Sequence, residues 1–178
     1  MLLQNDYFRN RDIDWFIQIN DMPIHVASGG GALPYIIQED FERNKKLLRE
    51  INRRPNFFLK REILIRSDDI QQILKFEQQQ IELILSACHV AVRNNNIINT
   101  YIEAIYSTSF IKYACKGFTS FDKTNINDSE DENYHLVASS PSVINPIIFN
   151  NIPKVYIPNW DKLFNSNLKL VKIINSAF

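Results

Sequence analysis

Residues 13–19 restrict the fold more than any other stretch, because apolar and polar side chains alternate along them. Successive side chains of a β-strand point to opposite faces, so this alternation predicts a strand with one face in the core. The apolar face comprises Ile13, Trp15, Ile17 and Ile19, and the other carries Asp12, Asp14, Phe16, Gln18 and Asn20. Asn20 and Asp21 favour a turn, and residues 24–28 are typical of a returning strand. We therefore expect a β-hairpin over residues 13–28.

Two helical segments follow the hairpin. Residues 36–54 carry apolar side chains at helical spacing and end before Pro55. Ser67, Asp68 and Asp69 can cap a long apolar-periodic run that extends to residue 116 and is interrupted by asparagines at 94–96. We interpret this run as two antiparallel helices, because a single helix of about 50 residues would be about 70 Å long, too long for this chain to cover.

Short strands are expected at 63–65, 134–139 and 154–157, between polar or proline-rich stretches. The segment 167–174 fits either a last strand or a short helix. Together these elements predict a single α+β domain over residues 1–178. Its mostly antiparallel sheet would begin with the N-terminal hairpin and pack against a layer of three helices that includes a long helical hairpin.

Three of the four glycines are consecutive, at Gly29, Gly30 and Gly31, directly after the hairpin. A strand, glycines and a helix in this order can hold an anion on backbone N–H groups. The glycine spacing of nucleotide-binding loops is absent, however, so the sequence favours a turn that needs positive φ angles. A small-molecule or phospholigand site at this loop is an alternative, with His25 and His135 as candidate ligand-binding side chains.

No recognisable set of catalytic or metal-binding residues is present in the sequence. If residues 24–28 and 134–139 are strands, His25 and Ser28 point to opposite faces, whereas His135 and Ser139 share a face but lie about 13 Å apart. Motifs of serine and cysteine hydrolases and metal-binding spacings such as C-x-x-C are absent. We therefore predict no catalytic residue, metal or cofactor, and favour a protein that is not an enzyme.

Charge is distributed unevenly, although the net charge is zero. Residues 43–66 carry nine Lys or Arg and two Glu, a local charge of +7, and residues 122–132 carry five acidic residues and one Lys, a local charge of −4. The basic segment predicts contact with nucleic-acid phosphates or with an acidic partner. The acidic segment 122–132 is a candidate partner of the basic segment, either within the fold or between two subunits. The expected contact residues are Arg43, Lys46, Arg49, Arg53 and Arg54.

These observations favour a non-catalytic intracellular binding or scaffolding domain that self-associates. Nucleic-acid binding through residues 43–66 and a small-molecule or phospholigand enzyme at Gly29–Gly31 are the alternatives. No apolar run reaches the roughly 20 residues that span a bilayer, and the N-terminal residues lack the pattern of a signal peptide. We therefore expect a cytoplasmic protein with a homo-oligomeric or other protein partner and no membrane contact.

Overall fold

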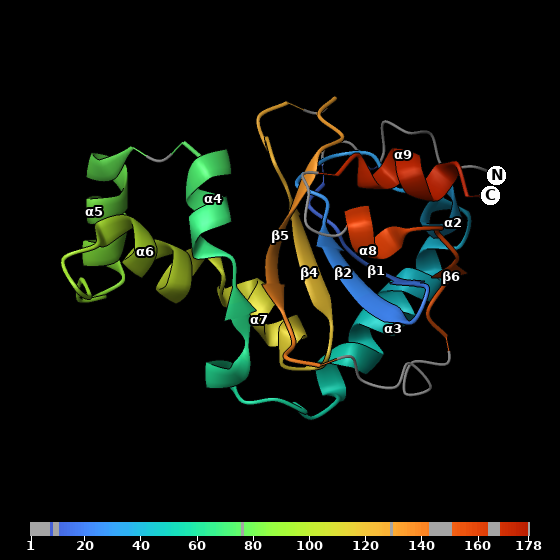
Figure 1. The fold of residues 1–178 in the computed structure, drawn as a ribbon, viewed down its shortest axis with the longest axis horizontal. Coiled ribbons are helices and arrows are strands. Elements are labelled where there is room, and N and C mark those ends of the chain that lie inside the picture. The colour runs from blue at the N-terminus through green and yellow to red at the C-terminus, as the bar shows by residue number, and fades with distance from the viewer. Residues whose placement is uncertain are drawn as a thin grey trace.

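The computed structural model describes Phe8 and residues 11–75, 77–128, 130–142, 151–163 and 168–177. The predicted hairpin is central to it (Figure 1): β1 (Asp14–Ile19) pairs antiparallel with β2 (Met22–Ala27). The register places Asp14 opposite Ala27 and Phe16 opposite His25. The turn includes Asn20, whose φ of 53° lies in the left-handed region that asparagine tolerates. The structure thus contains the hairpin and the turn that the alternation predicts.

The hairpin belongs to a six-stranded sheet of mixed direction, and the fold is α+β. The strand order is β3–β5–β4–β2–β1–β6, with β3 at Leu64–Ile65, β4 at Thr119–Lys123, β5 at Tyr134–Ser139 and β6 at Lys154–Val155. The β1–β2, β4–β5 and β3–β5 pairs are antiparallel, whereas β2–β4 and β1–β6 are parallel. Two antiparallel hairpins are therefore joined through the parallel β2–β4 pair.

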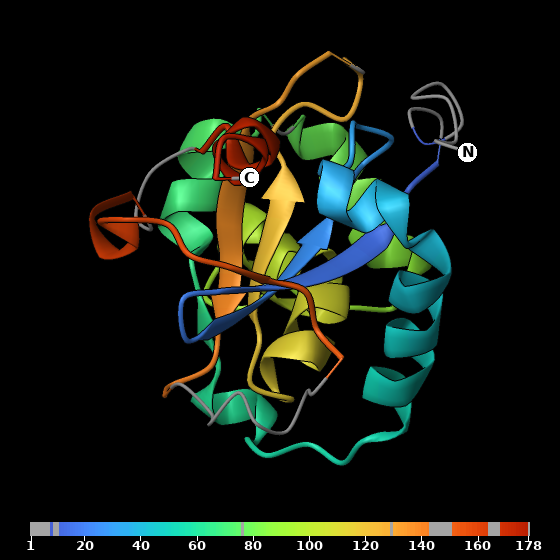
Figure 2. The ribbon, with the colours of Figure 1, turned by 90° about the vertical axis from the view of Figure 1, so that its right-hand side faces the viewer.

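Helices cover both faces of the sheet (Figures 1 and 2). On one face, α8 (Trp160–Leu163) and α9 (Leu170–Asn175) pack on the apolar side of the hairpin, which Trp15, Ile17 and Ile19 form. On the other face lie α3 (Phe41–Arg53) and α7 (Thr108–Ala114). The predicted single layer of three helices is wrong, because α8 and α9 have only four and six residues, too few to show helical periodicity.

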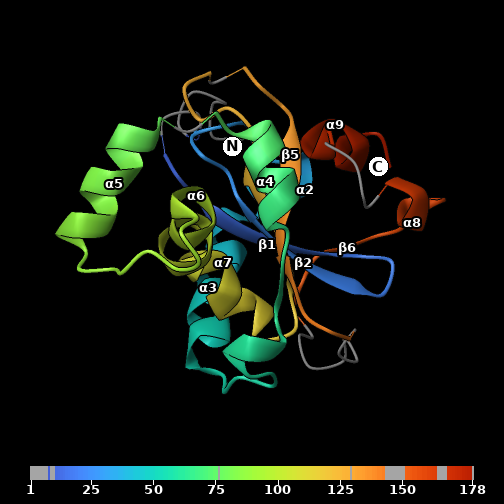
Figure 3. The same ribbon diagram turned by 60° about the vertical axis from the view of Figure 1, so that its left-hand side comes forward.

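Both predicted helical segments are divided. The first consists of α2 (Tyr35–Glu39) and α3, separated at Asp40. The second consists of α4 (Ser67–Ile73), α5 (Gln78–Ala87), α6 (Ile97–Tyr101), a π-helical turn η2 (Ile102–Tyr106) and α7. Figure 3 shows the turn between α5 and α6, where Asn94 and Asn95 have positive φ angles, as the asparagines suggest. Among the described helices, none combines the length and apolar character needed to cross a bilayer.

The long helical hairpin is wrong because its parts pack on different neighbours. Ile70 of α4 belongs to a buried cluster with Val137 of β5, whereas α5 contacts α6. Helical periodicity indicates which residues are buried but not against which element. The C-terminal segment combines both predicted alternatives, since Leu168 pairs with Tyr134 as an isolated bridge and α9 follows it.

A side chain completes the outer edge of β1. Within the described part of the chain, the short strand β6 pairs with β1 at Gln18 and Ile19 alone. Farther along that edge, Asn44 of α3 accepts a hydrogen bond from the Phe16 N–H at 3.3 Å through Oδ1 and donates to the Asp14 carbonyl at 2.9 Å through Nδ2. Asn44 is buried, and it does for two backbone groups what a neighbouring strand would do.

We expect Asn44→Ala to lower the free energy of unfolding by about 2–3 kcal/mol, because it leaves buried backbone groups of β1 without partners. Urea unfolding measures this change. Asn52→Ala, at an exposed position of the same helix, is the matched control and should shift stability by less than about 0.5 kcal/mol. Equal losses in the two variants would contradict the role of Asn44.

Candidate functional site

The three glycines form the turn by which the chain leaves β2. Gly29 and Gly30 have φ angles of 51° and 76°, and the Gly31 N–H donates to the Ser28 carbonyl at 2.8 Å, as in a type I′ turn. The Gly29 N–H donates to the Asp12 carboxylate at 3.0 Å. The N–H groups of Gly29 and Gly31 are therefore both bonded within the protein. Since the Asp12 carboxylate already accepts from Gly29, this loop is better explained as a turn than as a binding site for an anion.

A buried lysine restricts the inner side of this turn. Lys123, at the end of β4, is fully buried, and its ammonium group has no hydrogen-bond partner among the described residues. A Cβ atom on Gly31 would lie 3.1 Å from Lys123 Nζ, and one on Gly29 would lie 3.1 Å from Lys123 Cβ. Glycine is needed here both for positive φ and for the close approach of Lys123.

His25 is the centre of a hydrogen-bonded network on the α7 face of the sheet. Its Nε2 lies 3.0 Å from Asp14 Oδ1, and its Nδ1 lies 3.2 Å from Ser120 Oγ. The Tyr113 hydroxyl donates to Asp14 Oδ2 at 2.9 Å, and the Tyr113 ring packs on the imidazole with 4.0 Å between ring centroids. One buried imidazole thereby links β1, β2 and β4 to α7.

The series Asp14, His25 and Ser120 has the residue types of a serine-hydrolase triad, but its geometry is reversed. In such triads the carboxylate is buried and the serine faces the substrate. Here Ser120 is fully buried, and the Asp14 side chain is 35% exposed. Ser28 is buried too, and its hydroxyl bonds to backbone groups of residues 11 and 13. Neither serine is therefore placed to act as a nucleophile. The part of the network that solvent reaches is the Asp14 carboxylate.

A second network contains the other predicted histidine. The Tyr106 hydroxyl, from η2, donates to Asp122 Oδ2 at 2.6 Å, and its oxygen lies 3.0 Å from His135 Nε2. Thr124 Oγ1 lies 3.4 Å from His135 Nδ1. With the proton of a neutral His135 on Nε2, His135 donates to Tyr106 and Tyr106 donates to Asp122. This network also ends on a carboxylate.

The two carboxylates lie in one row across the sheet. The register pairs Asp14 with Ala27, Ala27 with Asp122, and Asp122 with His135, so these side chains point to the same face. Asp14 and Asp122 flank a single strand, which corresponds to about 10 Å between their Cα atoms. Only the methyl group of Ala27 lies between them in the row.

Two tyrosines of the covering helical segment are separated by about the same distance as the two aspartates. Tyr106 and Tyr113 are seven residues apart, which is about 10 Å along a helix. One helical segment that crosses the strands can therefore place a tyrosine hydroxyl on each carboxylate. Tyr106 lies at the end of the π-helical turn η2, and such turns are frequent at functional sites because they change the direction in which side chains point.

Burial makes Asp122 a weaker acid than an ordinary aspartic acid side chain. It raises the pKa of this carboxyl group to about 6, with a further contribution from the negative charges of Asp12 and Asp14. Hydrogen bonds from Tyr106 and the Lys123 N–H lower the pKa but do not offset burial. Asp122 is therefore largely protonated below pH 6.

Asp14 has the opposite shift. Burial by itself raises its pKa, but hydrogen bonds from His25 and Tyr113, together with the positive charges of protonated His25 and of Lys112, bring the pKa below the ordinary 3.8. Burial lowers the pKa of His25, and it lowers the pKa of His135 to about 4. Both imidazoles are therefore neutral at pH 7, and Asp14 is ionised under conditions in which Asp122 holds a proton.

Ser139 does not share a face with His135, contrary to the expectation from strand alternation. The pairing of β5 with β4 shifts by one residue at Val137, which has no partner in β4. An extra residue in one strand reverses the direction of the side chains beyond it. Ser139 therefore points away from the face that carries His135.

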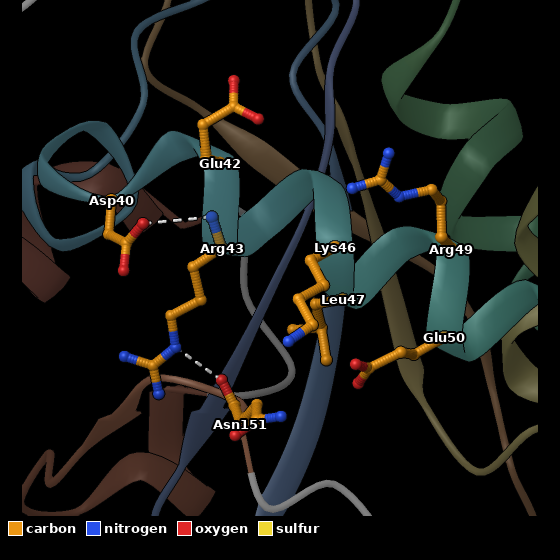
Figure 4. Close-up of a pocket in the computed structure, with 8 residues that line it drawn as sticks. All are labelled: Asp40, Glu42, Arg43, Lys46, Leu47, Arg49, Glu50 and Asn151. Atoms are coloured by element: carbon orange, nitrogen blue, oxygen red, sulfur yellow. Dashed lines mark hydrogen bonds between the residues drawn. The ribbon is translucent and has the colours of Figure 1, made fainter.

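The predicted basic contact residues lie on the outer side of α3. Arg43, Lys46 and Arg49 line a hollow of about 460 Å³ (Figure 4), together with Asp40, Glu42, Leu47, Glu50 and Asn151. The Arg43 Nε donates to the Asn151 carbonyl at 2.7 Å. Acidic side chains alternate with the basic ones in this hollow, so it does not offer the continuous positive surface that binds phosphates.

The other two predicted contact residues lie at the C-terminal end of α3. Arg53 is exposed, whereas Arg54 is half-buried and its carbonyl accepts a hydrogen bond from the Lys116 ammonium group. A second hollow, of about 400 Å³, lies at the hairpin turn between Asn20 and Tyr156. Neither hollow includes the predicted histidines or the glycines.

Sequence reasoning identified both histidines but missed Asp14, Asp122, Tyr106 and Tyr113. A signal existed for Asp14, because the predicted hairpin places Asp14 and His25 on the same face. None existed for Asp122, since the polar stretch after residue 118 resembles a loop and not a strand. Within the described part of the chain, no group of three or more His, Cys, Asp or Glu side chains is arranged to hold a metal ion.

Gly29→Ala should lower the free energy of unfolding by about 1–2 kcal/mol, because a side chain is disfavoured at positive φ and its Cβ would crowd Lys123. Gly30→Asn is the control, since asparagine tolerates the left-handed region. Thermal unfolding of the two variants measures the difference. A Gly29→Ala protein as stable as the Gly30→Asn protein would mean that the turn does not require glycine at position 29.

The contribution of Asp122 to stability should fall as the pH rises through 6, because the folded protein binds the Asp122 proton more tightly than the unfolded chain does. Comparison with a variant that lacks this carboxyl group isolates that contribution from those of His25 and His135, whose lowered pKa values act in the opposite direction. The contribution is complete below the ordinary pKa of 3.8 and is lost above the folded value of about 6, which corresponds to about 3 kcal/mol. Urea unfolding of Asp122→Asn, which cannot ionise, should match wild type at pH 4 and exceed it at pH 8. A stability difference that does not change with pH would exclude the raised pKa.

Comparisons with known proteins leave the function to be inferred from this geometry. No protein-family model matches the chain, and neither the curated proteins nor the solved structures include a match. The two carboxylate-ended networks on the α7 face are therefore the basis of the functional argument.

Proposed function

We propose that the protein is a hydrolase that uses Asp122 as general acid and Asp14 as general base on an uncharged substrate. The observation that carries this proposal is the row across the sheet, in which two aspartates with Cα atoms about 10 Å apart by strand spacing have pKa values shifted in opposite directions. Pairs of titratable groups with opposite shifts are typical of acid–base sites. Two carboxyl groups separated by roughly one strand width are also the arrangement of inverting glycoside hydrolysis, in which the carboxyl groups lie about 6.5–9.5 Å apart.

The reaction needs one proton from each side. Ionised Asp14 accepts a proton from a water molecule as the water oxygen bonds to the substrate carbon. Asp122 donates its proton to the oxygen of the leaving group as the bond between carbon and that oxygen breaks. The hydrogen bond from Tyr106 holds Asp122 in place, and the hydrogen bonds from His25 and Tyr113 hold Asp14.

The electrostatics of the row favour an uncharged substrate. Asp12 and Asp14 are close enough to Asp122 to raise its pKa, and both imidazoles are neutral at pH 7. The charge of Lys112 lowers the pKa of Asp14 but is not among the causes that shift the pKa of Asp122, so the negative charge around Asp122 is not balanced. A phosphate or carboxylate group would be repelled. We therefore place the site at the carboxylate row and not at the phospholigand loop that the glycines suggested.

A non-catalytic binding or scaffolding domain, as the sequence favours, is the second candidate. It is supported by the hydrogen bonds of the two aspartates, because all four carboxylate oxygens already have a partner: His25, Tyr113, Tyr106 and the Lys123 N–H. Buried polar groups satisfied in this way can serve only to join the helix layer to the sheet. In that case the networks would contribute to stability without any reaction.

Hydrolysis of a panel of nitrophenyl glycosides, followed between pH 4 and pH 8, distinguishes the two candidates. For the substrate that is cleaved, we expect the rate to decline above pH 6, because Asp122 then loses its proton. Asp122→Asn and Asp14→Asn should each lower kcat by about 10²–10⁴-fold. Asp128→Asn, in an exposed loop, is the control and should keep the wild-type rate.

A hydrolysis rate that is the same in wild type, Asp122→Asn and Asp14→Asn would exclude the catalytic proposal. If these variants also differed from wild type in stability, the non-catalytic role of the networks would be favoured. Circular dichroism of each variant separates loss of activity from loss of the fold.

A further inference from the structure

The segment 57–64 exposes apolar side chains at an open edge of the sheet. Phe57, Leu59 and Leu64 are 43%, 57% and 56% exposed, and Leu64 lies in β3, at one end of the strand order. No described strand pairs with the outer side of β3. We call this segment the basic edge, because Lys60 and Arg61 within it are exposed as well.

The basic edge is held by backbone hydrogen bonds. The N–H groups of Phe57 and Phe58 both donate to the Cys115 carbonyl, at 2.8 and 3.0 Å. Glu62 is the one acidic residue of the segment, and its carboxylate accepts a hydrogen bond from the Leu59 N–H at 2.6 Å. The segment therefore presents a fixed surface that is apolar and positively charged.

The loop between β4 and β5 has the complementary character. Ile126 is 65% exposed, and Asp128 and Glu130 are exposed beside it. Hydrogen bonds within the loop order it, since the Asn125 N–H donates to Asp131 Oδ2 at 3.0 Å and the Glu130 N–H donates to Asp128 Oδ1 at 2.9 Å. We call residues 124–133 the acidic loop.

The two surfaces lie at opposite ends of the same hairpin. Leu64 and Thr119 both pair with Ser139, so the basic edge lies at the beginning of β4, whereas the acidic loop follows its end. A strand of this length spans about 17 Å. Figures 1 and 2 show the acidic loop at the top of the molecule and the basic edge at the bottom. The acidic loop therefore does not reach the basic edge of its own chain.

We infer that the acidic loop of one molecule binds the basic edge of a second copy, in a head-to-tail contact. Ile126 would lie against Phe57, Leu59 and Leu64, with Asp128 and Glu130 near Lys60 and Arg61. The paired surfaces are different, so the contact is heterologous and leads to rings or open chains, unlike a twofold dimer. This inference is independent of the carboxylate row.

Charge reversal tests the contact. One variant reverses the basic edge (Lys60→Glu with Arg61→Glu), and a second reverses the acidic loop (Asp128→Lys with Glu130→Lys). Sedimentation velocity at about 50 mM salt, where screening is weak, measures the association of each. The control, Lys169→Glu with Lys172→Glu, has the same charge change as the basic-edge variant, at exposed positions in and beside α9.

We expect wild type and the control to associate at low salt and to dissociate at about 1 M salt, where the screening length is about 3 Å. Each reversed variant should remain monomeric alone, and an equimolar mixture of the two should associate again, because each supplies the charge that the other lost. The inference would be overturned if wild type were monomeric at low salt, or if the mixture of the two variants stayed monomeric. Displacement of the second copy from the basic edge by an oligonucleotide would overturn it as well.

Discussion

The register of the β1–β2 hairpin is the constraint on which the rest of the structure depends. It pairs Asp14 with Ala27 and Phe16 with His25, while the apolar side chains of β1 are buried against α8 and α9. A slip by one residue would exchange the two faces. Since Trp15, Ile17 and Ile19 cannot be moved into water without a large loss of buried area, Asp14 and His25 must lie on the opposite face, where Tyr113 of α7 contacts both.

Polar side chains buried between the sheet and a helix need hydrogen bonds, because an unpaired buried polar group costs several kcal/mol, on the order of 2–7. Tyr106 and Tyr113 supply hydrogen bonds from the helix layer. Asp14 gains a second side-chain donor in His25, whereas among the described residues Asp122 has only a backbone N–H besides its tyrosine. The different balance between burial and hydrogen bonding gives the two carboxyl groups opposite pKa shifts, on which the proposed acid–base role rests.

Much of the sheet could be predicted because its signals are local. Alternation, turn residues and proline punctuation indicate β1, β2 and β5, and consecutive glycines indicate a turn. The candidate site could be predicted only in part. His25 and Asp14 share a face within one hairpin, but the contact of His25 with Ser120 joins residues 95 positions apart. The bulge at Val137 has no sequence signature, so the alternation rule places Ser139 on the wrong face.

The sequence by itself determined the hairpin, the face to which each of its side chains points, and the need for glycine after β2, because these follow from side-chain periodicity and backbone sterics within a few residues. Only the tertiary structure decided that β2 and β4 lie parallel, that two carboxylates share one row, and that the acidic loop and the basic edge lie at opposite ends of the sheet. These depend on which distant elements bury their apolar surfaces against each other, and one chain's periodicity does not specify a partner.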